Sequence, residues 1–271
     1  MKTLSSEEKT TTTLSGISQA IILALGVYLL WTAATYLLEG RISLVHNPTP
    51  TGRVIYVLTA NVVIGIGLAV WALRMFVVSN IAGIKQLGFR SWQRTIIAIL
   101  LAFVVGGGLF LLQGPPSFNP LVLFNGLAQV LPVSIAEVVV CWAVIGIAFE
   151  AWGRSKGKVV GVIVGIVAAN FLFGFYHYAH SAPFNQTWMV FFLMIPGLIT
   201  SLVYFLGRDI YAAIIFHNFL GMMGVMQNVD LERFSQPLYH LYILLVISVI
   251  ALIAADGFFL RRLPWGPDTR I

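Results

Sequence analysis

Long, continuous apolar runs separated by short polar or proline-containing breaks dominate the chain. Eight such runs lie at about 17–38, 54–78, 93–113, 121–149, 158–180, 187–206, 209–227 and 238–260. Each approaches or exceeds the roughly 20 residues that a helix needs to cross about 30 Å of hydrocarbon. Because the runs are continuously apolar and do not alternate, they predict helices and not the strands of a membrane barrel. The predicted fold is an all-α, polytopic transmembrane helix bundle of about eight spans.

The two ends of the chain are more polar than this apolar region. We predict a polar N-terminal tail at 1–14, a transmembrane helical domain at 15–260 and a short basic C-terminal tail at 261–271. The first apolar run is too long for the core of a signal peptide and lacks a small-residue cleavage site, so we expect it to be retained as a span.

Composition excludes a water-soluble globule. Of the 271 residues, 59% are hydrophobic and only 10% are charged, whereas about a quarter are charged in ordinary soluble domains. The single cysteine, Cys141, excludes a disulfide scaffold. The net charge of +6 comes from basic residues in short loops between the runs, so we expect membrane lipids, and not nucleic acid, as partners.

The placement of lysine and arginine predicts the orientation of the bundle. Of the 16 basic residues, only Arg41, Arg53 and Arg233 fall in the segments that lie outside if the N-terminus is inside. This bias follows the positive-inside rule and predicts that both termini are cytoplasmic. We expect an integral, multi-pass protein, located in the plasma membrane if the cell is prokaryotic.

Ionisable side chains within the apolar runs need a partner or a function, because each costs a few kcal/mol in hydrocarbon. Among the acidic residues, only Glu137 and Asp256 are expected within spans. Asp256 lies near the inner end of the last run, where Arg261 and Arg262 are its expected interfacial partners. Glu137 lies near the middle of the fourth run with no basic residue within a turn, so its partner must come from another helix.

Histidines on two other runs are the candidate partners of this glutamate. His177 and His180 share one helix face with Asn170 and Phe173, and His217 lies in the seventh run. Each histidine alone is more often a packing residue. A glutamate and histidines on three separate helices, however, are the groups needed to hold and activate a water molecule, directly or through a divalent metal.

At these residues the chain resembles the CPBP family, the CAAX-protease and bacteriocin-processing membrane proteins that are also called the Abi family. The family pattern is E-E-x-x-x-R on one span, F-x-x-x-H on the next and H-x-x-x-N later. Phe173 and His177 fit the second motif, and His217 fits the start of the third. The segment 84–90 is similar to the family's short L-G-[LF]-[RK] segment, so the resemblance covers about residues 80–225.

The chain departs from the family pattern at three positions. The best register places Ala136 and Glu137 where the family has two glutamates, and Cys141 where it has arginine. Gly221 stands at the usual asparagine position, although Asn218 directly follows the histidine of that motif.

A second register of the first motif uses Glu150 and Arg154. We reject it because these residues lie in the basic inner loop and Arg154 is only 23 positions before His177. Straight helices would place His177 about 28 Å from the inner end of its span and His217 only about 12 Å. Convergence of the two histidines therefore requires kinked or broken helices, or a later entry of the fifth span.

The resemblance implies an intramembrane endopeptidase that cleaves peptides or membrane-anchored protein tails. Transferred to this chain, Glu137 is the base, His177 orients the water or binds metal, and His217 stabilises the oxyanion. The same three residues are the candidate ligands of a zinc ion, although a metal-free site explains them equally. The supporting residues are Phe173, His180 and Asn218.

Other functions stay open at this stage. The altered motif positions also fit a catalytically inactive CPBP-like membrane protein that acts in immunity or partner binding. His177 and His217 are candidate axial ligands of a haem, but the sequence has no second histidine pair and no cofactor motif. A transporter with Glu137 as its proton site lacks repeat symmetry and paired broken helices.

Overall fold

The computed structural model describes residues 6–260, which form helices and connecting turns without any strand. In the first half, the helices are α1 (Ser6–Thr35), η1 (Tyr36–Gly40), α2 (Pro50–Tyr56), η2 (Val57–Leu68), α3 (Ala69–Val78) and α4 (Trp92–Leu112). Next come α5 (Pro120–Glu137), η3 (Val138–Gly146), α6 (Ile147–Gly153) and η4 (Arg154–Lys156). The remaining helices are α7 (Lys158–Tyr176), η5 (His177–Ala179), α8 (Thr187–Gly207), α9 (Ile210–Met226), α10 (Leu231–Phe234), α11 (Tyr239–Ala255) and η6 (Asp256–Leu260).

Most of these helices are long and apolar enough to span a membrane. Within the described residues, seven runs qualify by length and composition, namely Gly16–Gly40, Pro50–Val78, Trp92–Leu112, Pro120–Lys156, Lys158–Ala179, Thr187–Gly207 and Tyr239–Leu260. The remaining predicted run, the seventh, forms the shorter apolar helix α9, whose 17 residues extend about 26 Å. The polytopic helical bundle is confirmed, and the protein is an integral, multi-pass membrane protein.

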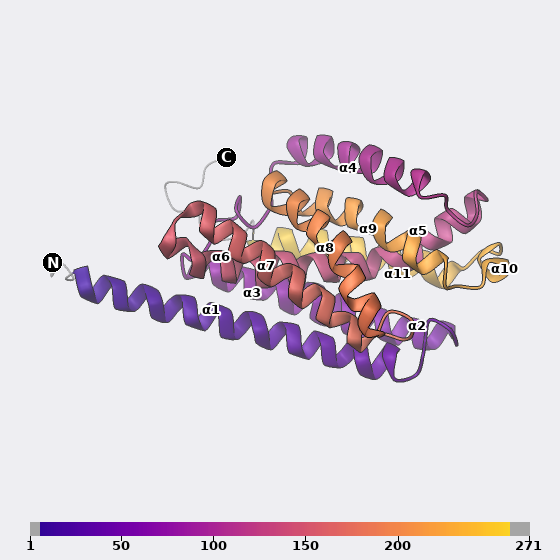
Figure 1. Ribbon diagram of the computed structural model, residues 1–271, viewed down its shortest axis with the longest axis horizontal. Helices are drawn as coiled ribbons and strands as arrows, with labels where there is room; N and C mark the ends of the chain where they lie inside the picture. Colours follow the sequence, from indigo (N-terminus) through magenta and orange to yellow (C-terminus); the bar gives the residue numbers. More distant parts are fainter. Residues whose placement is uncertain (1–5, 261–271) are drawn as a thin grey trace.

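The run Pro120–Lys156 is the central helix of the bundle. In its apolar window 94% of the residues are buried, against 22–44% in the other candidate spans. The surrounding helices keep apolar side chains on their outer faces, where lipid replaces the missing protein contacts. In Figure 1, α1 and α4 lie on opposite sides of this centre. A polar side chain on the central helix is therefore screened from lipid.

The described ends of the chain lie at one end of the bundle. Figure 1 shows the start of α1 and the end of α11 on the same side, with α2 and α10 at the other. That both termini lie in the cytoplasm stays a prediction. Of the two predicted tails, 1–5 and 261–271 lie outside the described residues, and 6–14 form the start of α1.

The central helix is irregular on both sides of Glu137. Pro132 lies inside α5, where it removes a backbone donor and crowds the preceding turn. Immediately after Glu137 the chain adopts the wider π-helical form of η3. The central helix is thus irregular around the predicted base, whereas α7, which leads to His177, runs unbroken from Lys158 to Tyr176.

Glu150 is a second buried carboxylate of the central helix. It is 3% exposed and accepts hydrogen bonds from the guanidinium of Arg208 at 2.8 and 2.9 Å. Arg154 and Gln86 donate to it at 3.2 and 3.1 Å. Glu150 lies within a candidate span, so the expectation that only Glu137 and Asp256 do so is wrong. The loop placement on which we rejected the second register is thus also wrong for Glu150. Its ion pairs are with Arg208 and Arg154 and not with the predicted histidines.

The segment 84–90 fixes the place where α9 begins. The carbonyl of Gly88, whose φ of +91° favours glycine, accepts a hydrogen bond from the backbone N–H of Ile210 at 3.0 Å. The Tyr204 hydroxyl donates to the carbonyl of Leu87 at 2.9 Å. Asp209 caps α9 by accepting from the N–H of Ala212. These contacts hold the first turn of α9 against the turn after α8.

Asp256, the other acidic residue predicted within a span, is fully buried. It accepts a hydrogen bond from the Tyr211 hydroxyl at 2.8 Å. Its expected partners Arg261 and Arg262 lie outside the described residues. Asp256 therefore helps to join α11 to α9 from within the bundle.

We predict that replacing Glu150 by alanine lowers the free energy of unfolding by about 3 kcal/mol, because the largely buried Arg208 guanidinium loses its counter-charge. Reversible unfolding in mixed micelles measures the change. The matched control is Arg154→Ala: its side chain is 38% exposed and it contributes an i,i+4 pair, so the loss stays below about 0.5 kcal/mol. Equal losses in the two variants would contradict the assignment.

Candidate active site

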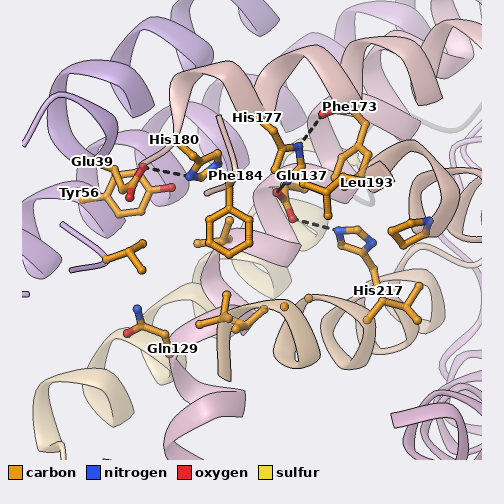
Figure 2. Close-up of a pocket in the computed structure, with 18 of the residues that line it drawn as sticks. Glu39, Tyr56, Gln129, Glu137, Phe173, His177, His180, Phe184, Leu193 and His217 are labelled. Carbon is orange, nitrogen blue, oxygen red and sulfur yellow. Dashed lines mark hydrogen bonds and ion pairs between the residues drawn. The ribbon is translucent and has the colours of Figure 1, made fainter. Parts of the chain in front are cut away.

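Glu137 lies at the centre of the predicted site, at the end of α5. Its Oε2 is 3.0 Å from Nε2 of His217, and its Oε1 is 3.9 Å from Nε2 of His177. All three side chains are less than 10% exposed. Figure 2 shows the carboxylate between the two imidazoles. The structure thus brings together, from three helices, the three residues that the sequence selected.

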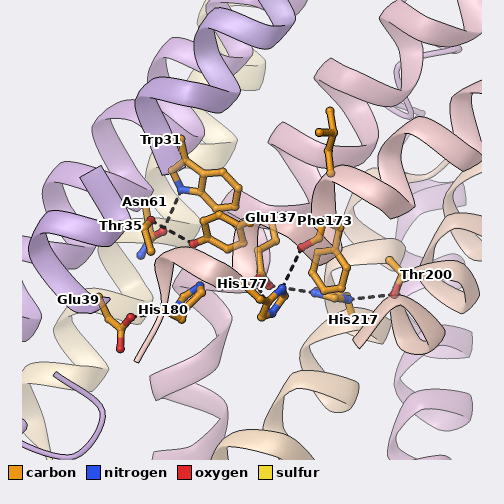
Figure 3. A network of polar contacts seen from close by, with 12 residues as sticks. Trp31, Thr35, Glu39, Asn61, Glu137, Phe173, His177, His180, Thr200 and His217 are labelled. Atoms are coloured by element: carbon orange, nitrogen blue, oxygen red, sulfur yellow. Dashed lines mark hydrogen bonds and ion pairs between the residues drawn. The ribbon is translucent and has the colours of Figure 1, made fainter. Parts of the chain in front are cut away.

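His217 joins the carboxylate to a hydroxyl of α8. Its Nδ1 lies 2.9 Å from Oγ1 of Thr200, and the same hydroxyl is 2.9 Å from the carbonyl of Pro196 (Figure 3). If the hydroxyl accepts from Nδ1–H, the 3.0 Å contact between Nε2 of His217 and Oε2 of Glu137 needs a further proton on one of the two atoms; if the hydroxyl donates to Nδ1, the neutral ring donates its Nε2–H to the carboxylate. In either case one proton joins the imidazole to the glutamate.

The end of α7 fixes the orientation of His177. The helix tightens into η5 at this residue, and its backbone N–H bonds to Gly174 and Phe175. The carbonyl of Phe173 is then free to accept a hydrogen bond from Nδ1–H of the His177 ring at 2.9 Å. In the neutral ring this leaves the lone pair on Nε2, which faces Glu137.

Aromatic rings enclose one side of the site. The Phe173 ring meets His177 and His217 edge-on, with centroids 4.7 and 5.2 Å apart. Trp142 lies against Phe173 and His217 and donates to the Ser201 hydroxyl at 2.7 Å. These contacts keep water from that side of the imidazoles and hold the rings in place. Phe173 thus has the supporting place that the second motif predicts.

A second polar cluster lies beside the first. His180 bonds through Nδ1 to Oε2 of Glu39 at 3.1 Å, and the backbone N–H of Ser181 donates to the same oxygen at 3.0 Å. The Ser181 hydroxyl donates to the other oxygen, Oε1. His180 therefore pairs with Glu39, as Figure 2 shows.

Sequence reasoning missed Glu39. The apolar pattern predicts that the first run ends at Leu38, one residue before Glu39. The helix in fact continues to Gly40, and Glu39 is 1% exposed. The end of α7 is held against α1 nearby, where Tyr176 stacks on Trp31 at 3.7 Å and its hydroxyl lies 3.1 Å from that of Thr35. The signal that the sequence offers for this buried residue is a carboxylate directly after an apolar run.

A cavity of about 110 Å³ connects the two clusters. Its polar lining is Glu39, Arg53, Tyr56, Gln129, Glu137, His177, His180 and His217. Asn218, predicted as a supporting residue, is buried but is not part of this lining, and its side-chain oxygen has no hydrogen-bond partner among the described residues. The cavity is large enough for a water molecule and a reacting group.

The positions that depart from the family pattern are packing positions. Ala136 is fully buried against η2, so close that a Cβ added at Gly65 would lie 2.5 Å from that of Ala136. Cys141 is fully buried in η3. Gly221 lines the cavity, but a Cβ there would lie 2.9 Å from a methyl group of Val130. The larger side chains of the family pattern do not fit without movement of these neighbours.

The arrangement does not fit the predicted zinc ion. Within the described residues, no group of three or more histidine, cysteine, aspartate or glutamate side chains is placed to hold a metal. Both ring nitrogens of His217 are already bonded, one to Thr200 and one to Glu137. We therefore derive no step through a metal.

We predict that Gly65→Ala destabilises the protein by about 1–3 kcal/mol, because the new methyl group overlaps that of Ala136. In the double variant Gly65→Ala with Ala136→Gly, the methyl group at this contact lies on residue 65 instead of residue 136. Most of the lost stability should therefore return. A double-mutant cycle of unfolding free energies measures the coupling. Simple additivity of the two changes would show that position 136 does not pack against η2.

Comparison with known families agrees with this geometry. Residues 121–223 match the family model described as type II CAAX prenyl endopeptidase, Rce1-like. The matched segment contains Glu137, His177 and His217, and the match confirms the resemblance to the CPBP family. Searches among curated proteins and solved structures found no match to the chain.

Proposed function

We propose that this chain, whose segment 121–223 belongs to the Rce1-like family of CAAX-type intramembrane proteases, is an endopeptidase that hydrolyses peptides or membrane-anchored protein tails. Glu137 is the general base in this proposal. The observation that carries it is the convergence of Glu137, His177 and His217 from three helices on one cavity.

A purely structural role accounts poorly for this arrangement. One hydrogen bond to His217 is enough to satisfy a buried, protonated glutamate. The chain also brings His177 to within 3.9 Å of the other carboxylate oxygen and holds its ring by a separate bond to Phe173. Both Oε1 of Glu137 and Nε2 of His177 thus face the cavity as acceptors, which is the pattern that orients a water molecule.

The proposed reaction begins with a water molecule that donates hydrogen bonds to Glu137 Oε1 and His177 Nε2. As its oxygen attacks the peptide carbonyl carbon, one proton passes to Glu137. The same proton then passes to the amide nitrogen as the C–N bond breaks, which leaves a carboxylic acid and an amine. The family resemblance implies that His217 stabilises the oxyanion. Because its Nε2 is bonded to Glu137, we propose instead that His217 holds this carboxylate in place.

A catalytically inactive member of the family is the alternative. The altered motif positions support this alternative, because an inactive protein that keeps only the scaffold loses functional side chains first. Ala136 and Cys141, however, are fully buried and do not line the cavity. Their replacement of glutamate and arginine therefore removes no group from the cavity lining, which favours the active protein. Gly221, at the usual asparagine position, does line the cavity, so this departure removes a polar group from it and favours the alternative.

We predict that Glu137→Gln lowers turnover by at least about 10²-fold, because the amide cannot accept the proton of water. Hydrolysis of a fluorogenic peptide library, with and without a lipidated end, by the purified protein in liposomes measures the loss. His177→Ala should lose activity in the same assay.

The matched control for this test is Glu232→Gln, since Glu232 is exposed on α10 and away from the cavity lining. It should retain wild-type turnover. Undiminished hydrolysis by folded Glu137→Gln protein would refute the assignment of the base. A wild-type protein that cleaves no peptide would favour the inactive alternative.

A second prediction concerns the hydroxyl behind His217. Thr200→Val keeps the shape of the side chain but removes the partner of Nδ1, so the imidazole loses its orientation toward Glu137. We expect about a 10–100-fold lower kcat, as for other groups that orient a catalytic histidine. Thr200→Ser keeps the hydroxyl and should restore most of the activity. Equal rates for the valine and serine variants would exclude this role.

A further inference from the structure

The cluster around Glu39 presents an unpaired imidazole nitrogen to the cavity that contains Glu137. Nε2 of His180 is buried and has no hydrogen-bond partner among the described residues, although the residue lines this cavity. The other ring nitrogen, Nδ1, is the atom that bonds to Glu39 at 3.1 Å. A buried polar atom without a partner costs free energy. The position of this nitrogen at the cavity therefore indicates a partner that is present only when substrate or water is bound.

The bonds of Glu39 determine where the proton of this ring lies. The carboxylate accepts hydrogen bonds from the backbone N–H and from the hydroxyl of Ser181. Because an ionised carboxylate only accepts, Nδ1 of His180 must donate to it. In the neutral ring the lone pair is then on Nε2, and a proton taken up there makes an imidazolium whose charge Glu39 balances. The pair can therefore accept a proton and release it again.

A purely structural role does not require the ring of His180. Ser181 alone joins η1 to the segment after η5 through two bonds to the carboxylate of Glu39. The turn after η1 is held to the same segment by His46, whose Nε2–H donates to the carbonyl of Ala182 at 2.6 Å. His46 does not line the cavity that contains the predicted base. His180 differs from these contacts because it leaves a proton-accepting nitrogen at that cavity.

His180 also lies beside the place where the proposed water molecule binds. Its ring centroid is 5.4 Å from that of His177, whose Nε2 is 3.9 Å from Oε1 of Glu137. Figure 2 shows the ring of His180 between Glu39 and His177. A substrate amide that meets a water molecule held by Glu137 and His177 therefore lies next to His180 as well.

We propose that His180 is the general acid that carries the proton from Glu137 to the leaving amine. When the water oxygen bonds to the carbonyl carbon, Glu137 takes one of its protons. Nε2 of His180 receives this proton, directly or through a second water molecule in the cavity, and gives it to the amide nitrogen as the C–N bond breaks. The products are a carboxylic acid and an amine, and both side chains return to their starting protonation states. This inference rests on the proposed function, because it adds a catalytic residue to the same reaction.

The test compares two forms of a fluorogenic peptide that the wild-type protein cleaves in liposomes. The two forms differ only at the scissile bond, where sulfur replaces the amide N–H in the second form, so that a thiolate leaves without needing a proton. His180→Gln should lower kcat for the amide by about 10²-fold, as for other general acids, and kcat for the thioester by less than about threefold. A normal rate with the thioester also shows that the variant is folded.

Glu39→Gln is a second variant that tests the same step without changing the imidazole. The imidazolium that forms on His180 loses its counter-charge, so the amide should again be slowed more than the thioester. The matched control is His46→Gln, which removes the other imidazole that joins the turn after η1 to the segment after η5. It should change the two rates by the same factor. Glu137→Gln should slow both substrates, because both need the attack of water.

The outcomes separate failure of this inference from failure of the proposed function. Equal slowing of amide and thioester by His180→Gln and by Glu39→Gln would make the pair a structural contact like that of His46. That result would overturn the inference and leave the protease intact. Undiminished hydrolysis of both substrates by folded Glu137→Gln protein, or a wild-type protein that cleaves no peptide, would overturn the proposed function and this inference with it.

Discussion

The site depends on the hydrogen bond that joins Glu137 to His217. A carboxylate in the centre of a membrane bundle is tolerated only when another group satisfies it, and this histidine does so from a different helix. The pairing fixes the depth of α9 relative to the central helix, and the turn around Gly88 and Arg208 fixes it a second time at the start of α9. The proposed chemistry and the assembly therefore rely on the same contacts, so a loss at either place disturbs both.

Much of this arrangement could be predicted from the sequence. Continuous apolar runs define the spans, and an unpartnered glutamate within one of them points to histidines in others. The sequence also locates the departures from the family pattern, but it does not show how these residues pack. That Ala136 packs against Gly65 depends on which helix faces which, and this is decided by contacts between residues 71 positions apart. Straight-helix geometry likewise could not show that the irregularity lies around Glu137 and not in α7.

The residues that the sequence did not reveal share one property. Glu39, Arg53 and Glu150 lie near the ends of their apolar runs, where a hydropathy pattern assigns charged side chains to loops. Each of them is in fact less than 5% exposed. Helical structure continues past the first charged residue whenever a neighbouring helix or turn supplies a partner, as Ser181 does for Glu39 and Arg208 for Glu150. The boundary of a run in the sequence therefore marks where partners are needed and not where the helix stops.

The cavity that contains Glu137 extends toward the end of the bundle where α2 lies, opposite to the start of α1, and this has a topological consequence. With both termini in the cytoplasm, as the positive-inside rule predicts, the proposed catalytic carboxylate would be reached from the far compartment. Polypeptides still in the cytosol would then be protected from cleavage by the membrane itself. Translocation, and not only sequence, would decide which chains are processed.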